Sequence, residues 1–422
     1  MRILFPKNLE RELLNKIKYR KAVVGVVGIG YVGKALAIGS ASANFHTLGF
    51  TRDPEKASHI NQNKKIDNFE ATADIKKLSE CDIICICVPT PIHENKTPDL
   101  EPLESAINNV KNLLKNGALV ILESTVACGT TRNIVLPILK QSGLKEENEF
   151  FLSFSPERID PVNKNFNIYN TPKVVSGLSR SSCDLACLFY KTFIKTVVPT
   201  SSLEVAEMSK LVENTFRFVN ISFVNELLDY TNALGIDLWE VIDIAATKPF
   251  GFLPHYPGPG IGGHCIPVDP YYLIDDAKKR GLKLRIVEKA GYVNDTQSKK
   301  IVSKTLDILK LTNGEKKIHS ALIVGLSYKE NTPDHRESPA FRIWKLLHKQ
   351  NIEVSYHDPY IPKYNSFSSE ELSAETIRDK DIIIVVTPHQ NINYSKLLSY
   401  NKPILDAKNA LKNYSSSNIY RI

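Results

Sequence analysis

Residues 22–33 read AVVGVVGIGYVG, an apolar β-branched run that ends in glycines and leads into residues 31–43, which have helical composition. A GxGxxG pattern between a strand and a helix is typical of dinucleotide binding. Gly28 would allow the tight turn, Gly30 would let the backbone approach a pyrophosphate, and Gly33 would let the helix pack closely. The helix N-terminus would then face the phosphate charge. A purely structural glycine-rich turn is the alternative interpretation.

Strand and helix patterns continue to alternate after this unit. Several runs are apolar and closed by Pro or polar residues, as expected for buried parallel strands. Together they predict a doubly wound α/β domain over roughly residues 20–200. The runs are 46–50 (HTLGF), 81–91 (CDIICICVPTP), 118–122 (ALVIL) and 150–154 (FFLSF).

The middle of the chain has a different pattern. Residues 203–234 contain neither Gly nor Pro and predict one long helix, and further helices are expected at 236–248 and 285–311. A second alternation follows, in which 380–389 (KDIIIVVTPH) repeats the pattern of 81–91, and this indicates a weak internal duplication. Because the second copy lacks the complete glycine pattern, we expect it to bind something other than a dinucleotide.

The predicted fold class is therefore α/β, with two Rossmann-like doubly wound domains joined by a central helical region that contains a long helix. The changes of pattern also predict the domain boundaries. They are 1–20 for an N-terminal extension, 21–202 for the first Rossmann-like domain, 203–312 for the central helical domain and 313–422 for the second Rossmann-like domain.

Composition narrows the function classes. The 422 residues carry 54 Lys and Arg against 46 Asp and Glu, a net charge of +8 with no block of like charges. Nucleic-acid binders concentrate their charge, so we expect a small anionic substrate and no nucleic-acid partner. No apolar run reaches the roughly 18 residues that span a bilayer, and the first residues lack a signal-peptide core. With seven scattered Cys, the chain fits a cytoplasmic protein with reduced thiols and no membrane partner.

Cys265 is the candidate nucleophile, because it lies in the Gly- and Pro-rich segment 255–272, which predicts a structured loop. The adjacent Gly262 and Gly263 would leave the thiol reachable and let the backbone approach a substrate. Asp269, four residues on, would handle a proton or hold a water. The other six cysteines fit strands, a helical face or a turn, where a free thiol is usually a small buried hydrophobe. No second Cys/His pair has the spacing of metal ligands, so we expect no metal.

Polar residues also recur along the expected long helix. Glu207, Lys210 and Asn214 are three and four residues apart and share one face. A lysine on that face beside a thiol would stabilise an oxyanion. A solvated polar stripe would show the same spacing, and the spacing alone leaves both interpretations open.

Further candidates follow expected strands, at the edge where α/β sheets bind ligands. Thr125 and Glu157 each come shortly after a strand of the first domain. In the third region Lys329, Asp334 and Arg336 follow a strand end and would clamp a diphosphate. Each residue alone fits a surface or capping position equally well, and the recurrence at strand ends favours a binding site.

Eight motifs follow one another along the chain: GIGYVG (28–33), VPTP (88–91), ESTVACGTT (123–131), SPERI (155–159), AEMSKLVEN (206–214), GPGIGGHCIPVD (258–269), GLSYKENTPDHRESPA (325–340) and LDAKNAL (405–411). In this order they make the chain resemble the UDP-glucose/GDP-mannose dehydrogenase family over nearly all residues after about residue 20. Within that family, the stretches 155–163 and 247–273, with His264, are most similar to the UDP-N-acetylglucosamine 6-dehydrogenase branch.

The resemblance implies an oxidoreductase that converts C6 of a UDP-sugar from alcohol to acid, with two NAD+ used in succession. Cys265 would form a thiohemiacetal and then a thioester, which is covalent catalysis. Lys210 and Asn214 would stabilise the oxyanions. The acidic product would serve capsule, O-antigen or another surface polysaccharide. The long helix would form the core of a homodimer or a higher homo-oligomer.

The resemblance also assigns the remaining positions. Asp269 and Thr125 would position or activate water, and Glu157 would act as acid or base in thioester hydrolysis. The first domain would bind NAD and the third the UDP-sugar. Cofactor positions are Gly28, Ile29, Gly30, Tyr31, Val32, Gly33, Thr51, Arg52, Asp53, Lys56, Pro89, Thr90, Thr125 and Arg336. Substrate positions are Glu157, Arg158, Lys210, Asn214, Pro254, His255, Tyr256, Pro257, Gly258, Gly262, Lys329 and Lys408.

The residues after the second strand leave the cofactor type open. The family's acid at this point aligns with Thr51, and Arg52 would suit the 2′-phosphate of NADP. Asp53 is either the ribose-binding acid, displaced, or a turn residue before Pro54. Lys408 stands where the family commonly has Arg, and it cannot make the same bidentate contact. We expect NAD, with NADP as the alternative.

Several functions compete with oxidation of UDP-N-acetylglucosamine. A UDP-N-acetylmannosamine or UDP-glucose dehydrogenase would differ only in the sugar pocket. A one-step dehydrogenase for a small hydroxy acid needs no thioester, and Cys265 argues against it. A non-catalytic nucleotide-sugar sensor would bind the sugar tightly without reducing a cofactor.

Overall fold

The computed structural model describes residues 7–64, 66–160, 163, 165–314 and 319–422. The chain forms two compact units. The first unit contains the described part of Met1–Glu213 together with Tyr271–Gly281, and the second contains Asn214–Pro270 with the described part of Leu282–Ile422. None of the described helices combines the length and hydrophobicity of a membrane-spanning segment.

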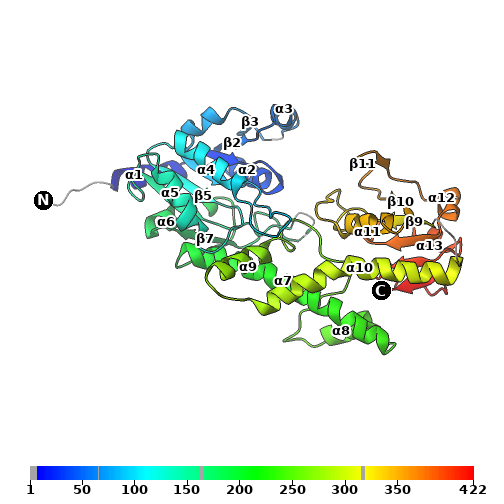
Figure 1. The fold of residues 1–422 in the computed structure, drawn as a ribbon. Coiled ribbons are helices and arrows are strands. Elements are labelled where there is room, and N and C mark those ends of the chain that lie inside the picture. Colours follow the sequence, from blue (N-terminus) through cyan, green and yellow to red (C-terminus); the bar gives the residue numbers. More distant parts are fainter. Residues whose placement is uncertain (1–6, 65, 161–162, 164, 315–318) are drawn as a thin grey trace. The chain divides into compact units, whose positions relative to one another are not determined.

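An eight-stranded sheet organises the first unit, in the order β3-β2-β1-β4-β5-β6-β7-β8 (Figure 1). The pairs are parallel except for β6 with β7, which is antiparallel. The strand order reverses between β1 and β4, the place where such sheets bind ligands. The strands are β1 (Val23–Val27), β2 (His46–Phe50), β3 (Phe69–Thr72), β4 (Ile83–Ile86), β5 (Ala118–Leu122), β6 (Phe150–Phe154), β7 (Lys173–Gly177) and β8 (Val197–Pro199).

Both faces of this sheet are buried, which explains why its strands are apolar throughout. Neighbouring residues on β4 point to opposite cores: Cys85 joins one apolar cluster and Ile84 the other. The unit's helices are α1 (Lys7–Lys18), α2 (Tyr31–Ser42), α3 (Pro54–Gln62), α4 (Glu101–Leu113), α5 (Leu136–Lys140) and α6 (Arg180–Tyr190), with short helical turns at Ile75–Glu80 and Thr131–Val135.

The N-terminal extension is integral to this unit from Lys7 onward, while residues 1–6 lie outside the described part of the chain. In α1, Leu13 and Ile17 are buried in the same core as β1 and α6. Lys16 Nζ also lies 3.1 Å from Asp82 Oδ1. The extension therefore covers apolar surface.

The second unit contains a parallel sheet in the order β10-β9-β13-β14-β15. Helix α10 lies beside α11, and together with α7 they cover part of the sheet's core (Figure 1). The strands are β9 (His319–Val324), β10 (Ile352–His357), β13 (Ile382–Val385), β14 (Ile404–Asp406) and β15 (Ile419–Arg421), with a small hairpin of β11 (Lys363–Tyr364) and β12 (Phe367–Ser368). The helices are α8 (Leu238–Ala246), α10 (Arg285–Asn313), α11 (Pro339–His348), α12 (Ala374–Asp379) and α13 (Tyr394–Leu398).

The predicted duplication is visible in the two sheets. The repeated sequence pattern forms β4 in one and β13 in the other, and each pairs with the first strand of its sheet. The first glycine after that strand makes the same backbone contact in both. Gly28 N donates to Phe50 O at 3.0 Å, and Gly325 N donates to His357 O at 2.9 Å. The predicted fold class, with two Rossmann-like sheets, is confirmed.

The predicted long helix is confirmed as α7 (Leu203–Ala233), a helix of 31 residues. Sequences rich in Leu, Val, Glu and Asn without Gly or Pro have no internal helix breaker. Helix α9 (Asp269–Lys279) begins at the end of the Gly- and Pro-rich segment. Both helices carry residues expected in the active site.

Candidate active site

The glycine loop between β1 and α2 has the geometry expected of a dinucleotide site. Gly28 has a φ of +92°, and a Cβ there would lie 2.8 Å from Cys87 O. A Cβ on Gly33 would lie 2.1 Å from Gly28 O, so only glycine lets the helix pack this closely. A Cβ on Gly30 would meet nothing within 4 Å, and no side chain caps the start of α2. The loop thus leaves a helix N-terminus open for a pyrophosphate.

The side chains of the glycine loop differ in their exposure, and Asp53, after the next strand, is bound within the protein. Ile29 is buried, Val32 is half-buried and Tyr31 is exposed, so Ile29 offers only its backbone to a ligand. Farther on, Asp53 Oδ1 accepts hydrogen bonds from the backbone N–H groups of Glu55 and Lys56 and caps α3. Asp53, predicted either as a displaced ribose-binding acid or as a turn residue before Pro54, thus caps a helix, and its contact with a ribose stays a prediction.

The other residues near the expected ribose also lie at the sheet's carboxyl edge. Thr51 is half-buried, whereas Arg52 and Lys56 are exposed. In the loop after β4, Pro89 is exposed and Thr90 is buried. This loop is held by the hydroxyl of Ser124, which donates to Val88 O at 2.7 Å. Thr125, the next residue, is half-buried beside it in sequence.

The segment after β6 carries Glu157 and Arg158. Glu157 Oε1 accepts hydrogen bonds from the backbone N–H groups of Arg158, at 2.7 Å, and Ile159. The Arg158 guanidinium contacts both carboxylate oxygens of Glu213, at 3.2 and 2.7 Å, and donates to Pro172 O. Arg158 is thus bound within the protein, and its contact with a substrate stays a prediction.

The polar face of α7 is buried, so it is not a solvated stripe. Glu207 is fully buried and accepts hydrogen bonds from the backbone N–H groups of Gly129, at 2.5 Å, and Thr131, at 2.8 Å. Burial raises the pKa of Glu207 despite those hydrogen bonds. Lys210 is 8% exposed and makes no hydrogen bond or ion pair with the described residues. A buried ammonium without a protein partner is suited to an anionic ligand or oxyanion.

Asn214 and Asp269 form the centre of the site in the second unit. Asn214 Nδ2 donates to Asp269 Oδ2 at 2.5 Å, and both side chains are buried. Asp269 is the first residue of α9, and its backbone N–H donates to Cys265 O at 2.9 Å. Cys265 therefore lies one turn from Asp269. Its residue is exposed, whereas the other six cysteines are buried or half-buried and all seven are unbridged.

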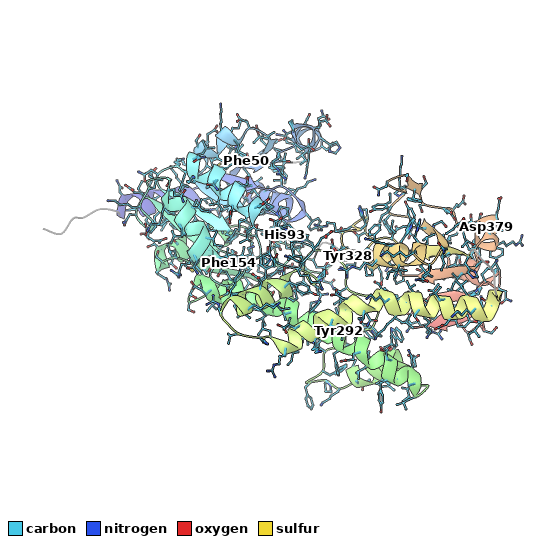
Figure 2. The ribbon with its side chains drawn as sticks, in the orientation of Figure 1. Phe50, His93, Phe154, Tyr292, Tyr328 and Asp379 are labelled. Atoms are coloured by element: carbon cyan, nitrogen blue, oxygen red, sulfur yellow. The ribbon has the colours of Figure 1, made fainter. Side chains whose placement is uncertain are left out.

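The paired glycines before Cys265 are explained by packing against the C-terminal domain. A Cβ on Gly262 would lie 2.7 Å from Tyr328 Cβ, and one on Gly263 would lie 2.8 Å from the Tyr328 ring. Tyr328 is labelled in Figure 2. Gly263 also has a φ of +87°, and its N–H donates to Arg336 O at 3.0 Å. These contacts give both glycines a packing role, and the approach of this backbone to a substrate stays a prediction.

Arg336 and Asp334 form an ion pair near this loop. Arg336 Nε lies 3.0 Å from Asp334 Oδ1, and Nη2 lies 2.6 Å from Oδ2. The contact raises the pKa of Arg336, and Cys265 adds to that shift. Burial, with the charge of Arg336, lowers the pKa of His264. The predicted contact of Arg336 with the cofactor stays a prediction.

The loop that precedes the Cys segment is anchored by two buried amides. Asn225 Oδ1, from α7, accepts from Gly258 N at 2.8 Å, and Asn294 Oδ1, from α10, accepts from Ile261 N at 2.8 Å. A Cβ on Gly258 would lie 2.9 Å from Lys408 Nζ, so two predicted substrate residues meet here. Burial of the ammonium group lowers the pKa of Lys408.

The other predicted residues of this loop differ in exposure. Pro254 and Tyr256 are exposed, His255 is half-buried, and Pro257 and Gly258 are buried. The hydroxyl of Tyr256 donates to Asp243 Oδ1 at 2.6 Å. The loop therefore combines exposed ring side chains with buried residues.

Lys329 belongs to a loop held by a buried histidine and aspartate. Asp358 Oδ2 accepts from the backbone N–H groups of Leu326, at 2.7 Å, and Ser327, at 2.9 Å, and lies 3.1 Å from His389 Nε2. His389 Nδ1 accepts from Asn331 N at 2.9 Å. These contacts fix both ends of the segment that carries Lys329, which is half-buried.

Sequence reasoning missed these anchoring residues. The amides of Asn225 and Asn294 lie in helices, where Asn looks like an ordinary surface residue. The Asp-Pro pair that ends β10 was visible as a repeat of the Asp-Pro after β2. That repeat could have pointed to Asp358, because an Asp after a strand commonly caps nearby backbone N–H groups.

Comparisons with known proteins agree with this geometry. Sequence profiles of the UDP-glucose/GDP-mannose dehydrogenase family match residues 22–194 (NAD binding domain), 204–296 (central domain) and 322–413 (UDP binding domain). A UDP-N-acetyl-D-glucosamine 6-dehydrogenase from Pseudomonas aeruginosa is 35% identical over 356 residues, covering 80% of this chain and 83% of that protein.

Relatives with another substrate are also similar. A UDP-N-acetyl-D-mannosamine dehydrogenase from Pyrococcus horikoshii is 29% identical over 419 residues, covering 94% of this chain and 98% of that protein. The solved structure of the UDP-D-ManNAc dehydrogenase from that organism matches with a TM-score of 0.87, covering 95% and 99% of the two chains.

The parallel sheets and the open glycine loop place the protein among the NAD-binding dehydrogenases. More narrowly, the chain belongs to the UDP-glucose/GDP-mannose dehydrogenase family. It is an NAD-dependent UDP-sugar dehydrogenase, which confirms the predicted enzyme class and the predicted cofactor NAD. The UDP binding domain confirms a UDP-sugar as the class of substrate.

Proposed function

We propose that the enzyme oxidises UDP-N-acetylglucosamine to UDP-N-acetylglucosaminuronic acid. The observation that carries this proposal is the exposed residue Cys265 one turn from the buried Asn214–Asp269 pair. In a dehydrogenase, a nucleophilic thiol can hold an aldehyde covalently for a second oxidation. The 35% identity to a UDP-N-acetyl-D-glucosamine 6-dehydrogenase supports the choice of sugar.

The reaction balances over two oxidations and one hydrolysis. The C6 alcohol first loses a hydride and a proton and becomes an aldehyde. Cys265 Sγ then adds to the aldehyde carbon to give a thiohemiacetal, which loses a second hydride and a proton to become a thioester. Water finally cleaves the C–S bond, and the carboxylic acid and the free thiol are released. NAD supplies the hydride acceptor for both oxidations when it is bound.

The chain's own polar residues have distinct roles in this scheme. Lys210, buried and without a protein partner among the described residues, and Asn214 would stabilise the oxyanions. Asp269, with Thr125, would hold the hydrolytic water and accept its proton, because Asn214 keeps the carboxylate oriented. Glu157 would act as a second acid or base.

Separate parts of the chain would bind the cofactor and the substrate. The residues around the open glycine loop fit NAD, since a helix N-terminus without a side-chain cap faces open space there. The anchored loop at 254–262, with Lys329 and Lys408, would bind the UDP-sugar. The domain boundaries 1–20, 21–202, 203–312 and 313–422 are proposed on the same basis.

A homodimer formed through α7 is part of the proposal. One face of α7 carries large apolar side chains that are 39–65% exposed. Soluble proteins rarely leave such a stripe uncovered, and repeated apolar positions along one helix suit a second copy of the same helix. The stripe comprises Val205, Met208, Val212, Phe216, Phe223 and Tyr230.

UDP-N-acetylmannosamine is the second candidate substrate, because relatives with that activity cover 92–94% of this chain. We would measure kcat/KM for UDP-N-acetylglucosamine, UDP-N-acetylmannosamine and UDP-glucose with NAD+ and with NADP+. The highest value for UDP-N-acetylglucosamine with NAD+ is expected. The highest value for another sugar would overturn the choice of substrate while leaving the family chemistry intact.

We also propose that the acidic product serves surface polysaccharide synthesis in the cytoplasm, such as synthesis of capsule or O-antigen.

A further inference from the structure

A buried lysine lies behind Glu157 in the first unit. Lys173 is the first residue of β7, and β7 runs antiparallel to β6. The start of β7 therefore lies at the carboxyl end of β6, where the segment 155–158 begins. Phe154, the last residue of β6, is labelled in Figure 2. The reversal of one strand thus brings a lysine to the edge of the sheet where Glu157 lies.

The Lys173 ammonium group is surrounded by acceptors. It donates to Glu123 Oε2, to Pro156 O at 3.2 Å and to Ser155 O at 3.4 Å. Glu157 Oε2 lies 3.9 Å away. The side chains of Lys173, Glu123 and Glu157 are 8%, 1% and 13% exposed. The lysine therefore contacts one carboxylate closely and a second at the limit of an ion pair.

Other titratable groups also face this cluster. Tyr190, from α6, donates to Glu123 Oε1, and Lys173 Nζ lies 5.2 Å from its ring. Cys85, on β4, is buried close by and Cys87, just after β4, is half-buried, and burial raises the pKa of both thiols. Burial raises the pKa of Tyr31, and the carboxylates of Asp160 and Glu157 add to that shift. At neutral pH these thiols and phenols are uncharged, so the charges nearest to Glu157 are those of Lys173, Glu123 and Asp160.

The electrostatics of the trio are asymmetric. Burial alone would lower the pKa of Lys173, but the two carboxylates outweigh it and the pKa is raised. Burial raises the pKa of Glu123, with Lys173 acting in the opposite direction. One ammonium group thus serves two carboxylates, so each carboxylate changes the charge that the other experiences.

We propose that Lys173 is a positioning residue for the reaction, which holds Glu157 in place at the edge of the sheet, while Glu123 contacts the same ammonium group and so competes with Glu157 for it. The inference rests on the function proposed for Glu157. It refines that function, because Glu157 would enter the hydrolysis as a base. Its Oε1 is occupied by two backbone N–H groups, so after Asp269 has taken the first proton of the attacking water, Oε2 is the atom that takes the second, from the hydroxyl of the acid being formed. That proton leaves with the regenerated thiol or to solvent.

The test compares four variants of the full-length enzyme: Lys173→Met, Lys173→Arg, Glu123→Gln and the double variant Lys173→Met/Glu123→Gln. The enzyme is loaded with UDP-N-acetylglucosamine and NAD+, quenched at intervals, and the Cys-bound acyl species is followed by intact mass from about pH 5 to pH 9. The rate at which the acyl species is lost is plotted against pH, and the midpoint of the acidic limb of this profile is compared between variants. Circular dichroism and thermal unfolding report whether each variant folds.

The two single changes should move the midpoint in opposite directions. Lys173→Met removes a positive charge near Glu157, so the pH midpoint of the acidic limb should rise by about one pH unit. Glu123→Gln removes the carboxylate that competes for the Lys173 ammonium group, so the same midpoint should fall. Lys173→Arg should stay near the wild type. The double variant removes the unpaired buried carboxylate, so it should fold even if Lys173→Met does not, and it should still show the raised midpoint.

Glu157→Gln distinguishes the two levels of the proposal. If this variant loses the acidic limb while the Lys173 and Glu123 variants leave the midpoint unchanged, the positioning role is wrong and Glu157 keeps its function. If Glu157→Gln hydrolyses the acyl species with the wild-type pH profile, the proposed role of Glu157 is itself wrong.

Discussion

Asn214 and Asp269 are joined by a hydrogen bond of 2.5 Å between Nδ2 and Oδ2, although they are 55 residues apart in the chain. The amide comes from the middle of a long helix and the carboxylate from the first turn of another, four residues after Cys265. A buried carboxylate held by an amide has a fixed orientation, which is what a group that activates water requires. The contact therefore links the residue proposed to stabilise the oxyanion with the one proposed to cleave the thioester.

Asp269→Asn should slow thioester hydrolysis by about 10²- to 10⁴-fold, because the amide cannot accept the proton from water. Both oxidations precede this step, so a rapid burst of NADH should be followed by a slow phase, with the acyl-enzyme visible by intact mass. Asp275→Asn, on the same helix and ion-paired with Lys279 one turn later, is the matched control. Loss of the burst itself would show that Asp269 acts before the thioester forms.

Asn225→Ala should weaken binding of the UDP-sugar. It leaves the buried N–H of Gly258 without its acceptor, which costs about 1–3 kcal/mol and loosens the loop. We expect KM for the UDP-sugar to rise about tenfold, with KM for NAD+ unchanged. Asn220→Ala, on the same helix with its amide donating to the carbonyl of Phe216 one turn earlier, should match the wild type. Equal rises in both KM values would mean that the loop does not hold the sugar selectively.

Asp358 should make the enzyme's stability dependent on acidity. Burial alone would raise its pKa, but hydrogen bonds from His389 and the backbone hold it below the ordinary value of 3.8. Its contribution is therefore complete above about pH 4 and is lost as the pH falls through the folded-state pKa. Asp358→Asn should lower the free energy of unfolding at pH 7 by about 1–3 kcal/mol.

Urea unfolding from pH 3 to pH 7 measures both effects of this substitution. The variant should lack the part of the acid dependence that comes from Asp358. Asp379→Asn, at a site 74% exposed, is the control and should change little. A variant that keeps the complete acid dependence would exclude Asp358 as its source.

Phe223→Glu should dissociate the proposed homodimer, because Phe223 is 56% exposed in the apolar stripe of α7 and a charge there would be buried by a second copy. Light scattering after size-exclusion chromatography should show a dimer for the wild type and a monomer for the variant. Arg217→Glu, at an exposed position of the same helix outside the stripe, should remain dimeric. A wild-type monomer at micromolar concentration would contradict the dimer.

Sequence patterns within single short segments predicted most of the fold. The apolar runs became β1, β2, β4, β5, β6 and β13, and the stretch without Gly or Pro became α7, because burial on two faces and helix propensity act over short segments. The antiparallel return of β7 was not predicted. Its position depends on pairing with β6 across a connection of 18 residues, from 155 to 172, which no local pattern specifies.

The site was predictable where a residue's chemistry is visible in its own segment. Cys265 is an example, since a thiol in a Gly-rich loop stands out. The role of Lys173 could not be predicted, because a single lysine at the start of a strand gains its role only from its contact with Glu123, which follows another strand. The packing role of Gly263 could not be predicted either, because this glycine packs against Tyr328, which lies 65 residues later in the chain.

The thioester route is tested most directly with limiting UDP-N-acetylglucosamine and excess NAD+, by counting NADH formed per sugar consumed and weighing both product and enzyme. We predict two NADH per sugar, a uronic acid product and an acyl group on Cys265 in the quenched wild type. Cys265→Ala should form no acid, while Cys128→Ala should behave as the wild type. One NADH per sugar, or full acid production by Cys265→Ala, would contradict the proposed mechanism.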